Sequence, residues 1–263
     1  MPRTLRLDLE LVRRGLIGSR AAARRAIEEG RVTVRGFPAE RASSLVTADD
    51  PIALVGDPAP FVSRGGEKLD AALQVFDVVV RARRWLDAGA STGGFTDRLL
   101  QGGAEEVVAI DVGYGQFAWE LRNDPRVTLI ERKNVRTLER SDLPFSPDGV
   151  VADLSFISLT LVIGALAEVA ANHADHLLLV KPQFEVGRTD VDKGVVRDPA
   201  LWRAAIERVV VSAREHDLEL RDVSLAHPPG PAGNREFFVH LTRGGQSGTD
   251  AIEREVERAA GEI

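Results

Sequence analysis

Short apolar runs alternate with longer amphipathic stretches over most of the chain. From residue 85 onward, apolar and β-branched runs are followed by segments whose apolar residues recur at helical spacing. This alternation predicts strands and helices in turn, which is the pattern of a doubly wound α/β sheet. The predicted strands span 85–87, 107–111, 127–131, 150–153, 177–181, 218–227 and 237–242, and the predicted helices span 96–101, 116–122, 159–172 and 200–215.

The last two predicted strands have a very short connection. Only "PPGPAGNRE" separates them, and so short a loop requires an antiparallel pair, because a parallel pair needs a crossover segment. The other strands are joined through helical stretches and are expected to run parallel. A mainly parallel seven-stranded sheet that ends in one antiparallel hairpin is the Rossmann-like plan of class I methyltransferases.

The first 60 residues follow a different plan. An amphipathic segment with Leu7 and Leu11 on one face stops at Gly15, and Ser19 can cap a second helix that ends at Gly30. "RVTVRG" then alternates as a strand does. The pattern therefore predicts a small α+β domain over residues 1–60, a linker near 57–62, a main α/β domain over 63–245 and a helical tail over 246–263.

Charge is distributed unevenly between these parts. The net charge is −6, but residues 1–41 hold ten Arg and five acidic residues, so the remainder carries −11. Arg20 and Arg24 lie on one face of the second predicted helix, with Arg25 beside them. Together with Arg6 they suit contacts to RNA phosphate and sugar, although a solvated helix face is the alternative. The segment from about residue 5 to 60 resembles the S4 RNA-binding domain, which implies an RNA partner.

The composition excludes several kinds of site and favours a cytoplasmic protein. The chain has no cysteine, which excludes disulfides and thiolate metal sites and favours a cytoplasmic location. The N-terminus lacks the apolar core of a signal peptide, and charged residues interrupt every apolar stretch before it is long enough to span a membrane. His173 and His176 form an H-x-x-H pair without a third ligand nearby, so no metal site is expected.

A glycine-rich turn stands between the first strand and the first helix of the α/β domain. The stretch "WLDAGASTGGFTDRLL" lacks the G-x-G-x-x-G spacing of dinucleotide folds, which argues against a nicotinamide-dependent dehydrogenase. The turn suits S-adenosylmethionine, which carries no phosphate and needs an acid for its ribose hydroxyls. Asp111, 22 residues after Gly89, is predicted to be that acid, although it can instead cap the following turn. The predicted cofactor contacts are Ser63, Gly89, Ala90, Ser91, Thr92, Gly93, Gly94, Phe95, Asp111, Val112, Gly113, Asn134, Asp153 and Leu154.

Seven motifs carry a resemblance to a known family. They are "SRGGEKL", "DAGASTGGFTDRLL", "DVGYGQ", "LRNDPRV", "VVADLSFISL", "LLLVKPQFEVGR" and "PPGPAGNREFF". Through them the chain resembles the TlyA family, also called hemolysin A, over essentially its whole length. The resemblance implies an S-adenosylmethionine-dependent ribosomal RNA 2'-O-methyltransferase with an S4 domain and an FtsJ-like catalytic domain. Its implied substrate is cytidine in 16S and 23S RNA or in 23S RNA alone, and the helical tail favours the branch with both substrates.

The same resemblance implies a catalytic set of two lysines and two carboxylates, Lys68, Asp153, Lys181 and Glu236. Asp153 and Lys181 each end a predicted central strand, at the edge where open α/β sheets bind ligands. A lysine can deprotonate a ribose hydroxyl or stabilise the alkoxide as a cation, and Lys181 is the expected residue for this work. Lys68 is expected to position the hydroxyl, while the two carboxylates hold the ammonium groups. A purely structural Lys181–Asp153 pair is the alternative, and the sequence leaves open which lysine carries the proton.

Two other classes of protein are alternatives to a methyltransferase. One is a pore-forming, hemolytic protein, as the second family name suggests, but no spanning segment supports it. The other is an RNA-binding assembly factor with an inactive methyltransferase domain, which the intact glycine turn and the four catalytic positions oppose. Phe184 can stack on a base or pack in the core, and the sequence does not choose between these roles.

Overall fold

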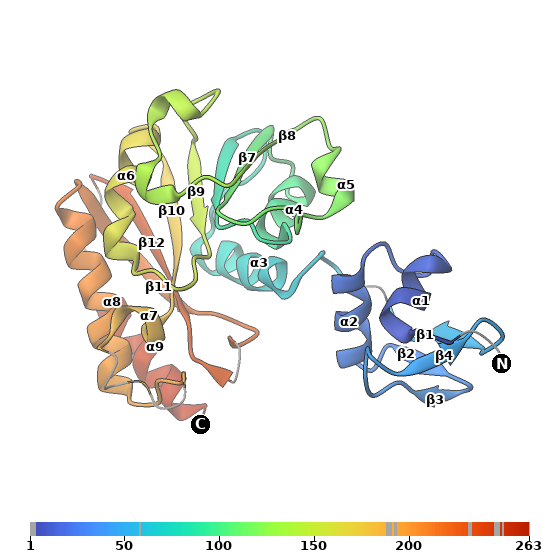
Figure 1. The fold of residues 1–263 in the computed structure, drawn as a ribbon. Coiled ribbons are helices and arrows are strands. Elements are labelled where there is room, and N and C mark those ends of the chain that lie inside the picture. The colour runs from blue at the N-terminus through green and yellow to red at the C-terminus, as the bar shows by residue number, and fades with distance from the viewer. Residues whose placement is uncertain are drawn as a thin grey trace. The chain divides into compact units, whose positions relative to one another are not determined.

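The computed structural model describes residues 4–57, 59–187, 191, 194–230, 233–244, 248 and 250–262. The chain divides into two compact units, Met1–Ser63 and Arg64–Ile263 (Figure 1). Within the described residues, no helix is long and apolar enough to cross a membrane.

The N-terminal unit packs two helices against small antiparallel sheets. Its core contains apolar side chains of both helices, such as Leu11 and Ala26, together with Val32 and Val46 from the strands. As the sequence predicts, Ser19 caps the second helix by accepting a hydrogen bond from Ala22 N at 3.2 Å, and Gly30 adopts a left-handed φ of 69°. Strand β1 pairs with β4, and β2 lies between β3 and β5. The elements are β1 (Thr4–Arg6), α1 (Leu7–Arg13), α2 (Arg20–Glu28), β2 (Val32–Val34), β3 (Phe37–Pro38), β4 (Leu45–Thr47) and β5 (Ile52–Leu54).

The C-terminal unit is built on one seven-stranded sheet with the order β11-β12-β10-β9-β6-β7-β8. The pairs from β10 to β8 are parallel, whereas β12 runs antiparallel to both of its neighbours. The predicted fold class is therefore confirmed, including the antiparallel hairpin after the parallel strands. The strands are β6 (Arg84–Ala88), β7 (Glu106–Asp111), β8 (Val127–Glu131), β9 (Gly149–Ala152), β10 (Asp175–Val180), β11 (Leu218–Leu225) and β12 (Phe237–Arg243).

Helices cover both faces of this sheet (Figure 1). On one face α3 packs against α4, which lies on β6 and β7. On the other face a continuous core joins alternate residues of the strands to α6, α8 and α9. The helices are α3 (Arg64–Phe76), α4 (Gly94–Gln101), α5 (Trp119–Arg122), α6 (Ile163–Val169), α7 (Pro182–Glu185), α8 (Pro199–Arg214) and α9 (Asp250–Gly261), with 3-10 turns η1 (Val135–Thr137), η2 (Arg140–Asp142) and η3 (Leu159–Leu161).

One predicted helix, 116–122, is shorter than the sequence pattern suggests. Only Trp119–Arg122 is α-helical, and in the lost first turn Ala118 N donates a hydrogen bond to the Thr92 carbonyl at 3.1 Å, while carboxylates hold the loop before it. Asp111 accepts a hydrogen bond from Gly113 N at 2.6 Å, and Glu131 accepts one from Gly115 N at 2.7 Å. These local bonds compete with helix formation.

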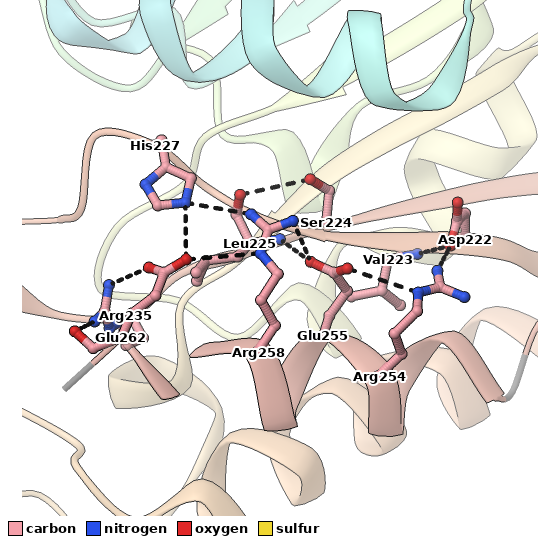
Figure 2. A network of polar contacts seen from close by, with 10 residues as sticks. All are labelled: Asp222, Val223, Ser224, Leu225, His227, Arg235, Arg254, Glu255, Arg258 and Glu262. Atoms are coloured by element: carbon pink, nitrogen blue, oxygen red, sulfur yellow. Dashed lines mark hydrogen bonds and ion pairs between the residues drawn. The ribbon is translucent and has the colours of Figure 1, made fainter. Parts of the chain in front are cut away.

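Helix α9 belongs to the C-terminal unit. It buries Ile252 and Val256 in the core beside α8 and β11. Figure 2 shows how its charged residues attach to the edge strand β11: Glu255 accepts a hydrogen bond from Leu225 N at 3.0 Å, and Arg254 pairs with Asp222 at 2.6 Å. Helix α9 thus satisfies a backbone donor of the strand that ends the sheet.

Candidate active site

The glycine turn after β6 is held against the segment that follows β9. Gly89 has a φ of +86°, and a Cβ at this position would lie 2.6 Å from the carbonyl oxygen of Asp153. Glycine is therefore required here both by backbone conformation and by close approach. The contact joins two loops at the carboxyl edge of adjacent parallel strands, which is where such sheets bind ligands.

Asp111 ends β7 and connects the glycine turn to the next loop. Its carboxylate accepts hydrogen bonds from Ser91 N at 2.7 Å and Gly113 N at 2.6 Å. The Gln116 side chain adds a longer contact of 3.3 Å to the same carboxylate. The predicted acid thus faces the glycine turn, and it also makes the turn contact that the sequence left as an alternative.

A cavity of about 450 Å³ opens at this edge, within the size range of small-molecule sites. Seven of the predicted cofactor residues line it: Gly89, Ser91, Asp111, Val112, Asn134, Asp153 and Leu154. Six further lining residues were not predicted: Gln116, Val135, Ser155, Phe156, Ile157 and Val162. The remaining predicted contacts, Ser63, Ala90, Thr92, Gly93, Gly94, Phe95 and Gly113, are not among the lining residues.

Two of these remaining residues have well-defined structural surroundings. Gly93, with φ +97°, directs its Cα hydrogen toward the side chains of Leu121 and Phe117, where a Cβ would lie 2.5 Å from Leu121 Cδ1. Phe95 is buried and packs against Phe238 of β12, with ring centroids 5.8 Å apart. The structure places both in the packing behind the turn.

Asp87 lies beneath the glycine turn and is fully buried. Its Oδ2 accepts hydrogen bonds from Thr96 N at 2.9 Å and from Thr96 Oγ1 at 2.7 Å, whereas Oδ1 has no hydrogen-bond partner among the described residues. Burial is the main cause that raises the pKa of Asp87 to about 7, and the nearby charges of Asp153 and Asp111 act in the same direction.

Lys181 and Asp153 form an ion pair at the end of the central strands. Lys181 follows β10 and is 9% exposed, and its Nζ lies 2.5 Å from Asp153 Oδ1. The same Nζ donates a hydrogen bond to Ser155 Oγ at 3.0 Å. Two residues that line the cavity, Asp153 and Ser155, thus orient the ammonium group, whereas Lys181 itself is not among the lining residues.

Lys68 and Glu236 form a second, more deeply buried pair. Lys68 Nζ on α3 donates to Glu236 Oε2 at 2.6 Å, and Glu236 is fully buried. Val180 pairs with Phe237 across β10 and β12, so Lys181 and Glu236 come next at the same end of this antiparallel ladder. The structure therefore brings all four predicted catalytic residues to the same edge of the sheet, as two lysine–carboxylate pairs.

The N-terminal unit gathers three of the four predicted RNA-binding arginines around one acid. Arg6, Arg20 and Arg24 lie 3.0, 3.3 and 3.4 Å from the carboxylate of Asp8, which is fully buried. The Arg6 guanidinium is the main cause that holds the pKa of Asp8 well below its usual range. Arg25 is placed differently, because it binds Glu29 at 2.6 Å and the Phe61 carbonyl at 2.9 Å.

The sequence analysis did not predict that Ser155, Phe156 and Ile157 line the cavity. Phe156 is 91% exposed at the cavity, although it is a large apolar side chain, and its ring lies 5.3 Å from that of Phe184. An aromatic residue three positions after the acid at the strand end was the available signal. Among the described residues no group of acids and histidines is arranged to hold a metal ion, and His176 is buried while His173 binds Asp148.

Comparisons with known proteins agree with this architecture. FtsJ-like methyltransferases match residues 61–243, and the S4 domain matches residues 5–52. A relative from Mycobacterium tuberculosis named 16S/23S rRNA (cytidine-2'-O)-methyltransferase TlyA is 49% identical over 243 residues, which cover 92% of this chain and 91% of the relative. Hemolysin A of Brachyspira hyodysenteriae is 36% identical over 241 residues, which cover 90% of this chain and 99% of the relative. A solved structure from Streptococcus thermophilus that bears a hemolysin name is 35% identical, with a TM-score of 0.80 and coverage of 100% of this chain and 97% of that one.

The sheet order, the glycine turn and the cavity at the carboxyl edge define a class I methyltransferase preceded by an S4 domain. The chain belongs to the TlyA family of FtsJ-like methyltransferases. The family resemblance inferred from the sequence motifs is confirmed.

Proposed function

We propose that this protein transfers a methyl group from S-adenosylmethionine to a cytidine 2'-hydroxyl in 16S ribosomal RNA, 23S ribosomal RNA or both. The observation that carries the proposal is the pair of buried lysine–carboxylate contacts at the edge of a ligand-sized cavity. An alcohol is a poor nucleophile at neutral pH, and a fixed lysine is a suitable group to assist it. The base and the RNA species are taken from the name of the Mycobacterium tuberculosis relative.

The residues of the cavity fit S-adenosylmethionine. Gly89 admits no side chain between the glycine turn and Asp153, which leaves backbone at the cavity wall. Asp111 lines the adjoining wall, where its carboxylate is suited to accept hydrogen bonds from ribose hydroxyls. When bound, the cofactor supplies a methyl group on a positively charged sulfur, which is already a strong electrophile.

The protein residues have to align the hydroxyl and manage its proton. Asp153 pairs with the Lys181 ammonium and Ser155 accepts a hydrogen bond from one of its three N–H donors, which leaves donor capacity for a substrate oxygen. As a cation, Lys181 stabilises the developing alkoxide; as a neutral amine, it accepts the proton. Glu236 fixes Lys68 close to the same strand end, where this second ammonium is suited to position the substrate hydroxyl or its phosphate.

The RNA partner is expected to contact the S4 unit through the Asp8 arginine group, which we define as Arg6, Arg20 and Arg24. Buried Asp8 holds the three guanidinium groups together. About half or less of each arginine side chain is exposed to solvent. Preassembled guanidinium groups suit phosphate contacts without sequence readout. The match of this unit to the S4 domain supports RNA as the partner of this surface.

Methyl transfer tests the proposal directly. Labelled S-adenosylmethionine is incubated with isolated ribosomal subunits and free ribosomal RNA, and the product is digested and identified by mass spectrometry. We expect 2'-O-methylcytidine, a block to alkaline cleavage at the modified nucleotide, activity without added metal, and no transfer by Lys181→Ala. Normal alkaline cleavage at the modified nucleotide would refute ribose methylation. Absence of any transfer, despite RNA binding, would favour an assembly factor, and lysis of cells by the purified protein without cofactor would favour a hemolytic protein.

A further inference from the structure

Two short segments that flank the active site lie side by side and are joined at three points. One is residues 153–159, which follow β9, and the other is residues 181–185, which comprise Lys181 and α7. Lys181 binds Asp153 and Ser155 at one end. In the middle, the rings of Phe156 and Phe184 lie 5.3 Å apart. At the far end, Glu185 accepts hydrogen bonds from Ser158 Oγ at 2.5 Å and Leu159 N at 2.8 Å.

Glu185, at the end of α7, is an acidic residue in a buried position. It is 2% exposed, and burial is the main cause that raises the pKa of its carboxyl group. A buried carboxylate is costly unless hydrogen bonds compensate it. Both of its side-chain partners belong to residues 153–159, and Arg208 of α8 donates to its backbone carbonyl at 2.6 Å. The side chain therefore connects one cavity-lining segment to the helix that follows Lys181.

The backbone of residues 153–159 needs such support. Phe156 has a φ of 64°, a left-handed conformation that is strained for a non-glycine residue and persists only where the surroundings hold it. Lys181 holds the residues before Phe156, and Glu185 holds the residues after it. The result is an aromatic ring exposed at the cavity and a fixed Asp153 beside Lys181.

We propose that Glu185 is a positioning residue of the methyltransferase: it fixes residues 153–159 and, through them, the Lys181–Asp153 pair and the Phe156 ring. This inference rests on the proposed function. Glu185 does not line the cavity, so its effect reaches the reaction only through these residues. Misplacement of a reacting group by about 1 Å can cost about 100-fold in rate.

The test compares Glu185→Gln with a matched control, Glu255→Gln. Glutamine keeps the size of the side chain, but its single carbonyl oxygen can accept from only one of the two donors in the same geometry. Glu255 is likewise buried and accepts from a backbone N–H, that of Leu225, but it connects α9 to the edge strand β11 (Figure 2). Both substitutions are expected to lower the melting temperature.

Only Glu185→Gln is expected to change catalysis. We expect kcat for methyl transfer to fall about 10- to 100-fold, while the KM for S-adenosylmethionine changes less than about threefold. Ser158→Ala removes one donor and leaves Leu159 N bound to Glu185, so it should lower kcat by a smaller factor. It also serves as the test if Glu185→Gln does not fold. An equal kcat for Glu185→Gln and Glu255→Gln, or an unchanged kcat for a folded Ser158→Ala, would overturn the proposal.

A second readout separates this proposal from the proposed function. Hydrogen exchange followed by mass spectrometry is measured on the full chain without substrate. The amides of residues 153–159 should exchange faster in Glu185→Gln than in wild type, while those of the glycine turn, 89–94, should not change. Glu255→Gln should leave both segments unchanged. If the wild type transfers no methyl group, the proposed function is refuted, but faster exchange of residues 153–159 in Glu185→Gln would still support a role of Glu185 in fixing this segment. Unchanged exchange in 153–159 would refute the positioning role itself.

Discussion

Lys68 Nζ and Glu236 Oε2 lie 2.6 Å apart, although 168 positions separate the two residues in the chain. Both side chains are almost completely removed from solvent. Because a charge in such a place must be paired, each residue explains the burial of the other. In the shallower Lys181–Asp153 pair at the same sheet edge, Asp153 lines the cavity, whereas neither Lys68 nor Glu236 does.

Breaking the deeper pair should be costly. Glu236→Gln leaves Lys68 buried without a counter-charge, and we expect the free energy of unfolding to fall by about 3–5 kcal/mol. The double change Lys68→Met with Glu236→Gln should recover part of this loss, because the uncompensated charge is gone. Urea denaturation of the three proteins measures both effects. A single Glu236→Gln that is as stable as wild type would show that solvent reaches Lys68.

Cofactor binding and catalysis should separate on two different residues. Gly89→Ala places a Cβ 2.6 Å from the Asp153 carbonyl in a left-handed backbone, so the cavity wall must shift. We expect its affinity for S-adenosylmethionine to fall about 10-fold or more. Lys181→Ala should bind the cofactor within about threefold of wild type and lose at least about 100-fold in transfer rate. Calorimetry and a transfer assay are sufficient, and loss of cofactor binding by a folded Lys181→Ala would contradict the assignment.

The arginines around Asp8 should carry part of the RNA affinity. Replacing Arg20 and Arg24 with Ala removes two of the three guanidinium groups, and each lost phosphate contact should lower the slope of log affinity against log salt by about one. Arg35→Ala is the control, because Arg35 pairs with Asp50 outside this group. Affinities measured across a salt series provide the test. A double variant with the slope of the control would assign these arginines to a solvated surface.

Asp87 should give the C-terminal unit a distinctive pH dependence. Its pKa is about 7 when folded and about 3.8 when unfolded, so between these values the folded protein holds a proton that the unfolded chain releases. The contribution of Asp87 to the free energy of unfolding is therefore fully present below pH 3.8 and is lost as the pH rises to 7. Relative to Asp87→Asn, wild type should lose stability from pH 5 to pH 8, on the order of a few kcal/mol. Parallel stability curves for the two proteins would show that Asp87 is already ionised when folded.

Local sequence was sufficient for the fold class and for seven of the residues that line the cavity, whereas six were not predicted. Apolar periodicity locates strands and helices because each depends on neighbouring residues, and the short "PPGPAGNRE" loop by itself requires the antiparallel hairpin. Gly89 and Asp111 were recognisable because turn and strand-end chemistry is also local. These predictions rest on interactions that span only a few residues of chain.

Only the tertiary structure decided which of these side chains meet. It sends Gly93 toward Leu121 and away from the cavity, attaches α9 to the edge strand, and places Glu185 beneath residues 153–159. Glu185 has no distinguishing local pattern in "KPQFE", because its role exists only once β9 and β10 are neighbours and the loops after them run side by side. Pairing over long chain distances depends on strand order and loop path, and neither is encoded in the spacing of nearby residues.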